Sequence, residues 1–597
     1  MKLSRLFVVV ALHCLLSVSA IATPTAEQAK EFLADAEQQL VELGEENARA
    51  AWIARNFINV DSQYVLSKIE GRASLLQVQF AKQAAQYDVV ELPADARRKL
   101  NLLKQGITLP VPDDKKLADE LATITSALQA AYGTGKYCPT KNNCMSLVKM
   151  EVAMGKEREP EKLLAMWRGW REVSPPMKSN YQREVEIANA GAKDLGYNDV
   201  GAMWRSGYDA SPTEFAASAD AQWQRIEPLY EALHCHVRAK LSEFYGADTV
   251  PLDEKIPAHL LGNMWAQQWS NIFDLVAPAA ADPGYDLDEL IEKKELSELD
   301  MVKTAEQFFV SLGLDPLPET FWERSLFTKP RDREVVCHAS AWNLDSKDDL
   351  RIKMCIQKNA DDFITIHHEL GHNYYQRAYK DQPPLFRGSA NDGFHEALGD
   401  TVALSITPDY LVEIGLLEKA PSVDKDIGQL LSQAMDKVAF IPFGLLVDKW
   451  RWQVFSGELS PDQYNSGWWK LREQYQGIEA PVKRTEADFD PGAKYHIPGN
   501  TPYMRYFLAH LQQFQFHKSL CETAGYKGPL HRCTIYKNKA AGKRLNAMME
   551  MGRSRPWPDA MQALTGQREL DASALLEYFA PLQEWLNEQN EGRKCGW

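Results

Sequence analysis

The chain has 597 residues, of which 45% are hydrophobic and 25% are charged, so it has ample material for a folded core. Its net charge of -15 argues against nucleic-acid binding, which needs a basic surface. The length fits either two to four domains or one large helical unit with a deep cleft.

The first 22 residues have the pattern of a secretory signal peptide. Lys2 and Arg5 form a basic start, residues 6–18 are largely apolar, and Ala20-Ile21-Ala22 provides a cleavage site. A membrane anchor is the alternative, but the apolar run is short and we find no later stretch long enough to span a bilayer. We therefore expect a signal peptide over 1–22, export to the periplasm or the medium, and no membrane anchor after cleavage.

Export makes disulfides plausible, and eight cysteines follow Cys14. Six of them form three pairs that are close in sequence: Cys138 with Cys144, Cys337 with Cys355, and Cys521 with Cys533. Cys235 and Cys595 are left over, and sequence alone does not settle connectivity. The chain has no N-x-[ST] glycosylation site, which favours a bacterial source.

The remaining chain is predicted to be mainly helical. Thr25 and Gln28 form a capping box before an amphipathic run, and the region 25–135 has the pattern of long helices. Four tryptophans in 145–250 are expected in the core: Trp167, Trp170, Trp204 and Trp223. Short strands are expected at Val335–Trp342 and Ile352–Ile356, and helices from 361 onward.

One helix carries the strongest chemical signal, the motif H-E-x-x-H at His368, Glu369 and His372. Residues four apart share a helix face, so the two imidazoles can bind one metal ion while Glu369 reaches a metal-bound water. The helix is supported by acidic residues in its first turn and by an apolar stripe of Phe363, Ile366, Leu370 and Tyr374.

A third ligand follows downstream. Glu396 and Asp400 are also four apart and share a face. A catalytic zinc takes three protein ligands, and a further carboxylate orients a ligand histidine. H-E-x-x-H followed by E-x-x-x-D is the gluzincin pattern, so we predict one Zn²⁺ held by His368, His372 and Glu396.

Several motifs together resemble the angiotensin-converting enzyme family of zinc dipeptidyl carboxypeptidases. They are Val336–Trp342, His367–His372, Gly393–Ala397, Phe489–Pro498 and Pro502–Phe507. The resemblance covers nearly the whole mature chain, and the three close cysteine pairs match the family's disulfides.

The resemblance implies an almost all-helical ellipsoid of two halves around a deep central channel, with an N-terminal helical lid and a few short strands near the zinc site. We expect a single peptidase domain over 23–597, with the lid region at 23–135 and the two-lobed remainder at 136–597.

The resemblance also implies roles for individual residues. Glu369 is the general base and later the acid, and Asp400 orients His368. His496 and Tyr506 stabilise the oxyanion, while His338 and Ala339 hold the substrate backbone. Gln267, Lys494 and Tyr503 bind the terminal carboxylate of an oligopeptide, and Phe440 and Phe443 line the pocket for its last side chain.

Gln267 bears on product length. Single-residue carboxypeptidases of the family have an arginine at this place, which moves the carboxylate clamp closer to zinc. Glutamine favours release of dipeptides, so a peptidyl-dipeptidase is the prediction and a carboxypeptidase that releases single residues is the alternative. A non-catalytic binding protein on the same scaffold is a third reading, disfavoured because the zinc ligands and Glu369 are intact.

The chain departs from the family at three places. His510 replaces a phenylalanine of the last-residue pocket, which opens that pocket to acidic or polar side chains. Arg205, Trp468 and Arg472 match one chloride site, and Arg505 matches the arginine of another. At the second site the family's tyrosine is matched to His236, and Asp392 replaces a proline. We expect Asp392 to pair with Arg505 and take the anion's place, which leaves chloride activation weak or confined to the first site.

Overall fold

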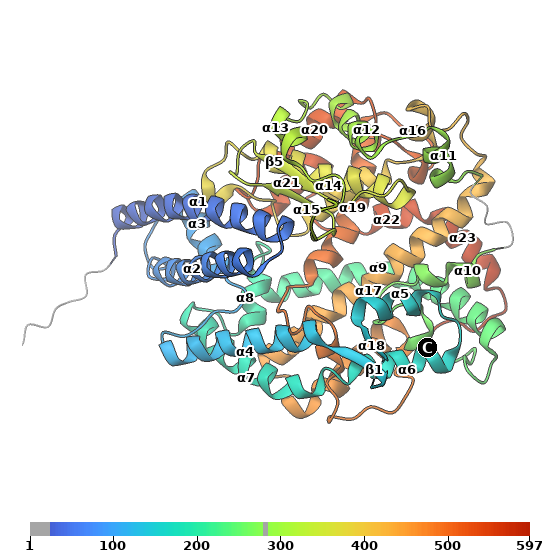
Figure 1. Ribbon diagram of the computed structural model, residues 1–597, viewed down its shortest axis with the longest axis horizontal. Coiled ribbons are helices and arrows are strands. Elements are labelled where there is room, and N and C mark those ends of the chain that lie inside the picture. The colour runs from blue at the N-terminus through green and yellow to red at the C-terminus, as the bar shows by residue number, and fades with distance from the viewer. Residues whose placement is uncertain (1–23, 142, 279–283) are drawn as a thin grey trace, which may run out of the picture.

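The computed structural model describes residues 24–141, 143–278 and 284–597. The expected signal peptide over 1–22 lies outside these ranges and stays a prediction. Within them the protein is mainly helical, with a few short strands, as the sequence predicts. In Figure 1, α11 to α16 lie in the upper half, α4 to α8 lie in the lower half, and α1 to α3 sit at one end. The central channel stays a prediction.

The helices have the following bounds. The first are α1 (Ala26–Asn56), α2 (Val60–Ala85), α3 (Ala94–Gln105), α4 (Lys115–Thr134), α5 (Leu147–Lys156), α6 (Pro160–Arg171), α7 (Lys178–Asp194), α8 (Val200–Ser206) and α9 (Pro212–Tyr245). The next are α10 (Phe273–Val276), α11 (Leu287–Lys293), α12 (Glu298–Ser311), α13 (Glu319–Arg324), α14 (Ala360–Ala378), α15 (Phe394–Leu404) and α16 (Pro408–Glu413). The last are α17 (Asp426–Ser456), α18 (Tyr464–Gln476), α19 (Met504–Thr523), α20 (Lys539–Met549), α21 (Trp557–Thr565), α22 (Ser573–Tyr578) and α23 (Ala580–Gln589).

The strands form small two-stranded sheets. They are β1 (Lys136–Thr140), β2 (Asn143–Ser146), β3 (Ile256–Pro257), β4 (Ser340–Asn343), β5 (Leu350–Lys353) and β6 (Ile478–Glu479). β4 and β5 pair antiparallel with Ala341 opposite Ile352, so two strands exist in the predicted region. Their bounds differ from the prediction, because β4 starts later than Val335 and β5 starts and ends earlier than Ile352–Ile356. β1 pairs with β2 antiparallel, and β3 pairs with β6 in parallel.

The N-terminal helices have small cores of their own. Thr25 and Gln28 form the predicted capping box of α1. Most buried apolar residues of α1, α2 and α3 pack into two clusters separate from the main core, and Ala81 of α2 is an exception that joins the main core. In contrast, Leu121, Ile124 and Leu128 of α4 belong to the main core. Within the expected lid region, α1 to α3 are therefore the part that packs as a unit, while α4 is joined to the body.

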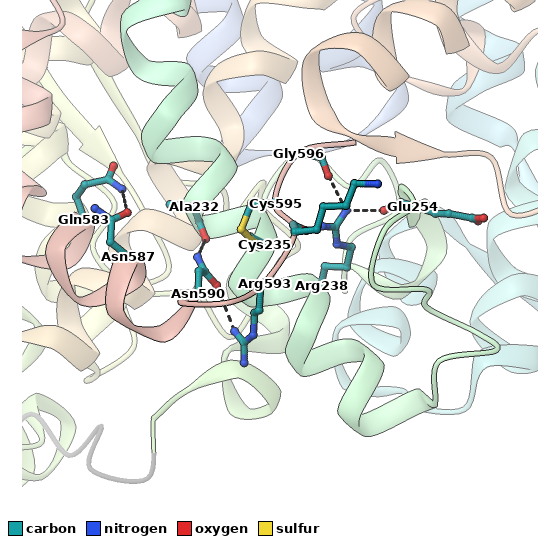
Figure 2. Close-up of a disulfide and its surroundings, with 11 residues drawn as sticks. Ala232, Cys235, Arg238, Glu254, Gln583, Asn587, Asn590, Arg593, Cys595 and Gly596 are labelled. Atoms are coloured by element: carbon teal, nitrogen blue, oxygen red, sulfur yellow. Dashed lines mark hydrogen bonds between the residues drawn. A yellow bond between two sulfur atoms is a disulfide. The ribbon is translucent and has the colours of Figure 1, made fainter.

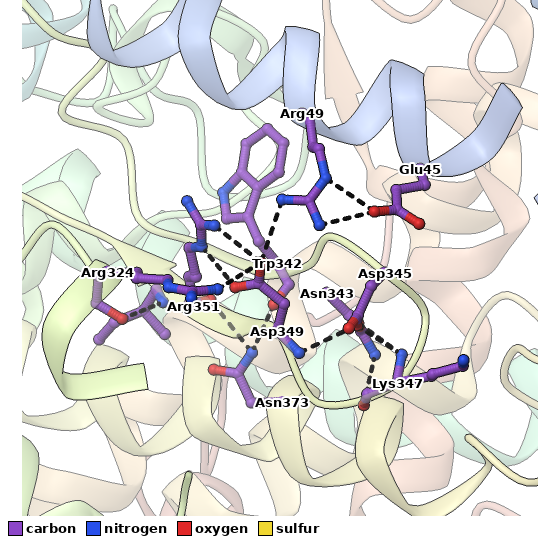
Figure 3. Close-up of polar contacts among 12 residues, drawn as sticks. Glu45, Arg49, Arg324, Trp342, Asn343, Asp345, Lys347, Asp349, Arg351 and Asn373 are labelled. Atoms are coloured by element: carbon purple, nitrogen blue, oxygen red, sulfur yellow. Dashed lines mark hydrogen bonds and ion pairs between the residues drawn. The ribbon is translucent and has the colours of Figure 1, made fainter. Parts of the chain in front are cut away.

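A charged cluster fastens α1 to the β4–β5 hairpin (Figure 3). Arg49 of α1 lies 3.3 Å from Asp349, which is buried and also holds Arg324 and Arg351 at 3.1 and 2.9 Å. Burial alone would raise the pKa of Asp349, but the arginines, Arg351 first, lower it. Asn373 of α14 donates to a backbone carbonyl of each strand, so the hairpin is tied both to α1 and to the motif helix.

Three of the four tryptophans that were predicted to lie in the core are found there. Trp167, Trp170 and Trp223 are buried, while Trp204 is partly exposed. One stretch, Val423–Ser456, does have the length and apolar composition of a membrane span, with mean hydropathy 1.4, so the expectation that no such stretch exists was wrong. Because 78% of its most apolar window is buried inside the protein, it serves here as a core helix.

All eight described cysteines form disulfides. The three pairs close in sequence are joined as the family resemblance implies: Cys138–Cys144, Cys337–Cys355 and Cys521–Cys533. The pair left open by the sequence, Cys235–Cys595, is joined as well, across 360 residues.

The Cys235–Cys595 bond is one of several contacts that fasten the C-terminal segment to α9 (Figure 2). Asn590 donates to the Ala232 carbonyl at 2.8 Å, and Arg238 donates to the Gly596 carbonyl at 2.8 Å.

Candidate active site

α14 carries the H-E-x-x-H motif and has the predicted form. Asn359 caps it by accepting a hydrogen bond from the Asp362 N–H at 2.8 Å. The predicted stripe is buried and fixes the helix against the core: Phe363, Ile366, Leu370 and Tyr374. The rings of His368 and His372, one turn apart, have centroids separated by 4.7 Å.

α15 packs directly on α14 and supplies Glu396 and Asp400. The approach is close because two glycines face each other. A Cβ at Gly371 would lie 3.1 Å from the Cα of Gly399, and a Cβ at Gly399 would lie 2.7 Å from the ring of His368. The missing side chains let the ligand helices meet.

The three predicted metal ligands come together. One donor atom from each of His368, His372 and Glu396 lies within 4.8 Å of the other two. In tetrahedral zinc, bonds of about 2.1 Å separate the donors by roughly 3.4 Å. His368 Nε2 lies 3.6 Å from Glu396 Oε2, so the nitrogen and oxygen donors present here fit zinc.

Asp400 lies behind the first ligand, as predicted. Its Oδ1 is 3.2 Å from His368 Nδ1, and Lys437 Nζ is 3.1 Å from its Oδ2. Burial alone would raise the pKa of Asp400, but Lys437 and His368 hold it far below its ordinary value. A charged carboxylate here keeps the proton on Nδ1 of His368 and leaves Nε2 for a metal.

The charges around the donors favour a cation. Burial lowers the pKa of His372 to about 4, so its ring is neutral at pH 7. Burial opposes protonation of His368, but Asp400 and Glu396 together raise its pKa to about 10. Burial also opposes ionisation of Glu396, yet His368 lowers its pKa. Without a metal, His368 is thus a cation at pH 7 that offsets the two carboxylates. A divalent ion would take over this role as it displaces the proton on Nε2.

Glu369 is buried beside the donors. Burial raises its pKa, and the neighbouring His368 opposes the rise. The backbone of Ala341 in β4 lies near its carboxylate and also opposes the rise in pKa. A carboxyl group whose pKa is raised towards neutrality is suited to taking up and then releasing a proton.

His496 and Tyr506, the predicted oxyanion donors, also lie together. His496 Nε2 is 3.4 Å from Tyr506 Oη. Burial lowers the pKa of His496, and the positive charge on Lys494 lowers it further, so the ring is neutral. Burial raises the pKa of Tyr506, which keeps its hydroxyl protonated. Arg451 donates to the His496 carbonyl at 2.9 Å and anchors the loop.

The predicted carboxylate clamp forms around a buried ammonium. Lys494 Nζ donates to Gln267 Oε1 at 2.6 Å and lies 5.7 Å from the centre of the Tyr503 ring. It also lies 4.1 Å from the centre of the Trp265 ring, a neighbour that the sequence did not suggest. Burial lowers the pKa of Lys494 to about 7, and Glu151 opposes the shift. Among the described residues no carboxylate lies within ion-pair distance of it, so the ammonium suits a ligand carboxylate.

The apolar residues predicted for the last side chain adjoin this clamp. Phe440 and Phe443 have ring centroids 5.9 and 5.6 Å from that of Tyr503. His510 stacks on Phe440 at 4.5 Å, and its Nδ1 bonds the Tyr506 carbonyl at 2.8 Å. The imidazole of His510 therefore lies beside these phenylalanines, at the pocket position where the sequence analysis noted that it replaces the family's phenylalanine.

His338 and Ala339 lie just before β4. His338 is exposed, and its Nδ1 lies 2.7 Å from the Ala339 carbonyl oxygen. Lys353 donates to the His338 carbonyl at 2.7 Å. Their proposed contact with a peptide backbone stays a prediction.

The structure separates the residues assigned to the first anion site. Trp468 and Arg472 are together, with the guanidinium 5.7 Å from the ring centre. Arg205 is elsewhere, 4.8 Å over the ring of Trp452. The arginine whose charge acts on Arg472 is instead Arg171 of α6.

Arg171 and Arg472 are both fully buried, and burial lowers the pKa of each to about 9. Arg171 donates to the Met264 carbonyl, and Arg472 donates to the adjacent Trp265 carbonyl. The sequence analysis did not include Arg171, which meets Arg472 only through the packing of α6 near α18.

At the second predicted anion site, the pairing of Asp392 with Arg505 is confirmed at 3.2 Å. The tyrosine beside them is Tyr208, whose pKa is raised by burial and further by the charge on Asp392. His236 is not there: it lies against the Val276 carbonyl at 3.0 Å, so the tyrosine was matched to the wrong position.

A mainly helical fold with these donors on two packed helices defines a gluzincin metal centre. A family model described as Angiotensin-converting enzyme matches residues 23–597, and the chain belongs to the angiotensin-converting enzyme family.

Relatives support this membership. The chain is 41% identical over 577 residues to the angiotensin-converting enzyme of Mus musculus, covering 96% of this chain and 44% of that protein. It is 44% identical over 493 residues to the angiotensin-converting enzyme of Theromyzon tessulatum, covering 81% of this chain and 80% of that protein. The chain thus spans less than half the length of the Mus musculus enzyme.

The contact between the ligand helices can be tested at Gly399. We expect Gly399→Ala to weaken zinc binding at least tenfold, because the new methyl group would displace the ring of His368. Zinc affinity is measured by competition with a chelator. Gly44→Ala is the matched control, since a Cβ there meets open space. Unchanged affinity in the Gly399 variant would show that the helices can separate freely.

Proposed function

We propose that the protein is a zinc-dependent peptidyl-dipeptidase that removes dipeptides from the C-terminus of oligopeptides. The observation that carries this is the joining of a His-His-Glu donor set with an adjacent buried carboxyl, Glu369. The buried ammonium of Lys494, which suits a terminal carboxylate, supports an exopeptidase.

Each residue then has a chemical task. Bound zinc supplies a Lewis acid that lowers the pKa of a water ligand and polarises the scissile carbonyl. Glu369 takes a proton from the attacking water and delivers it to the leaving amine. His496 and Tyr506 donate hydrogen bonds to the oxygen on which negative charge develops, a contribution of roughly 3–4 kcal/mol per donor.

The product length rests on the clamp. Gln267 accepts from Lys494 and so holds the ammonium in place. In this proposal the clamp, with Tyr503, fixes the substrate carboxylate two residues beyond the scissile bond. Release of single residues is the alternative, and a non-catalytic peptide-binding protein is a further one.

We also propose that residues 1–22 are a signal peptide and that 23–597 act as one catalytic unit in the periplasm or the medium. Four disulfides support an oxidising compartment. At the first anion site, we propose that chloride is held by Arg171, Arg472 and Trp468. Asp392 then takes the anion's place beside Arg505.

Product mass decides between the candidate activities. Incubation of the full chain with angiotensin I should yield the shortened peptide and a C-terminal dipeptide by mass spectrometry. Glu369→Gln and chelator treatment should each lower the rate by a factor of about 10³ or more. Release of single residues would favour the carboxypeptidase. If the zinc-loaded protein cleaved nothing, the non-catalytic peptide-binding protein would be the remaining candidate.

The pH dependence follows from Lys494. The pKa of its ammonium is lowered to about 7, so raising the pH through 7 removes the charge that binds the substrate carboxylate. We expect KM to rise above pH 7 while kcat changes less, because bound carboxylate favours the charged form.

Lys494→Arg provides the control, because a guanidinium keeps its charge in this range. The rise in KM should move to higher pH in that variant, even if its KM at pH 6 is larger. Identical alkaline limbs in both proteins would exclude Lys494 as the titrating group.

The corrected anion site gives a paired test. Arg171→Gln should remove most of any chloride activation, because it deletes one of two buried cations next to each other. Arg205→Gln should leave the chloride response unchanged, since its side chain lies over Trp452. Rates are compared at fixed ionic strength with chloride or acetate. The reverse pattern would restore the original assignment.

A further inference from the structure

The second histidine ligand has a partner of its own kind. His372 Nδ1 lies 3.3 Å from His395 Nδ1, and His395 Nε2 lies 3.2 Å from Tyr379 Oη. The ligand His372 thus begins a line of three rings, which continues with His395 at the start of α15 and ends with Tyr379 just after α14.

The arrangement mirrors that of the first ligand. His368 turns Nδ1 to Asp400 and Nε2 to Glu396. His372 likewise has Nδ1 occupied by a neighbour, which leaves Nε2 as its metal-binding atom. One ligand is therefore backed by a carboxylate and the other by an imidazole.

Proton positions along the line follow from metal binding. If His372 gives its Nε2 lone pair to a metal, its Nδ1 carries the hydrogen. His395 must then accept at Nδ1, so its own hydrogen is on Nε2 and points at the Tyr379 hydroxyl oxygen. Each nitrogen in the line has one donor or acceptor role, with no two hydrogens facing each other.

Packing holds the middle ring in register. The Tyr375 and His395 ring centroids are 4.6 Å apart, and the Tyr375 hydroxyl accepts from the Ala390 N–H at 3.3 Å. His395 also directly precedes the ligand Glu396 on α15. A shift of this ring would therefore disturb two of the three donors.

We propose that His395 is a positioning residue that accepts a hydrogen bond from His372 Nδ1 and thereby fixes its tautomer and direction for zinc. Tyr379 sets the tautomer of His395 in turn. This inference rests on the proposed zinc site and assigns the partner of its second imidazole.

Zinc affinity tests the proposal without reference to activity. We expect His395→Leu to raise the zinc dissociation constant 10- to 100-fold, measured by chelator competition on the full chain. His395→Asn should restore affinity to within about threefold of the parent protein, because the amide oxygen can occupy the place of Nδ1. Tyr379→Phe should show a smaller loss than the leucine variant.

His367→Asn is the matched control for loss of a buried histidine. His367 adjoins a ligand in sequence, but its nitrogens bond the Phe363 carbonyl and the Tyr410 hydroxyl, each at 2.8 Å. It should leave zinc affinity unchanged. Thermal unfolding of each metal-free variant separates damage to the fold from loss of metal.

The possible results lead to distinct conclusions. Parental affinity in His395→Leu, or equal losses in the leucine and asparagine variants, would overturn the positioning role while the zinc site stands. Absence of zinc binding by the parent protein would overturn the proposed function and this inference together.

Discussion

The distance between α14 and α15 is the constraint on which the metal centre depends. Two histidines come from one helix and a glutamate from the other, so no single helix contains the donor set. Gly371 and Gly399 allow the backbones to approach until the His368 ring lies against α15. Burial of the surrounding apolar residues favours contact between the two helices, and the absence of side chains at the glycines sets how short the interhelical distance can be.

Charge compensation is the second requirement of this site. Asp400 is partly buried and faces both His368 and Lys437, and Asp392 is partly buried and faces Arg505. Lys494 differs from these groups, because it contacts an amide oxygen and aromatic faces, and its carboxylate neighbour Glu151 acts on it from beyond ion-pair distance. A buried cation without an acid partner is costly, which is why it makes sense at a place where a ligand brings the anion.

The sequence predicted the chemistry at the centre better than the details around it. The H-E-x-x-H helix, its buried stripe and the partner carboxylates follow from helical periodicity, which places residues four apart on one face. Arg171 and Tyr208 could not be found in this way, because each meets its partners through tertiary packing between distant segments. The strand bounds were also missed, since two short strands are defined by their pairing with each other.

The same limit applies to His395. The position of this histidine directly before Glu396 does not predict a role for it. The fold shows that its Nδ1 faces the Nδ1 of His372. The family resemblance assigned roles residue by residue, yet two assignments put side chains together that do not meet: Arg205 with Arg472, and His236 with Arg505. The structure changed each of them by showing which side chains actually meet.

The Cys235–Cys595 bond makes the integrity of the molecule depend on its redox surroundings. A covalent loop of 360 residues restricts the unfolded chain by about 6 kcal/mol in the chain-entropy treatment, which is comparable with the entire net stability of many proteins. A thiol-rich cytosol would forfeit that contribution and would loosen the segment whose Trp597 ring rests 4.9 Å from His234. Recombinant material prepared under reducing conditions would accordingly be a less robust molecule than the oxidised one described here.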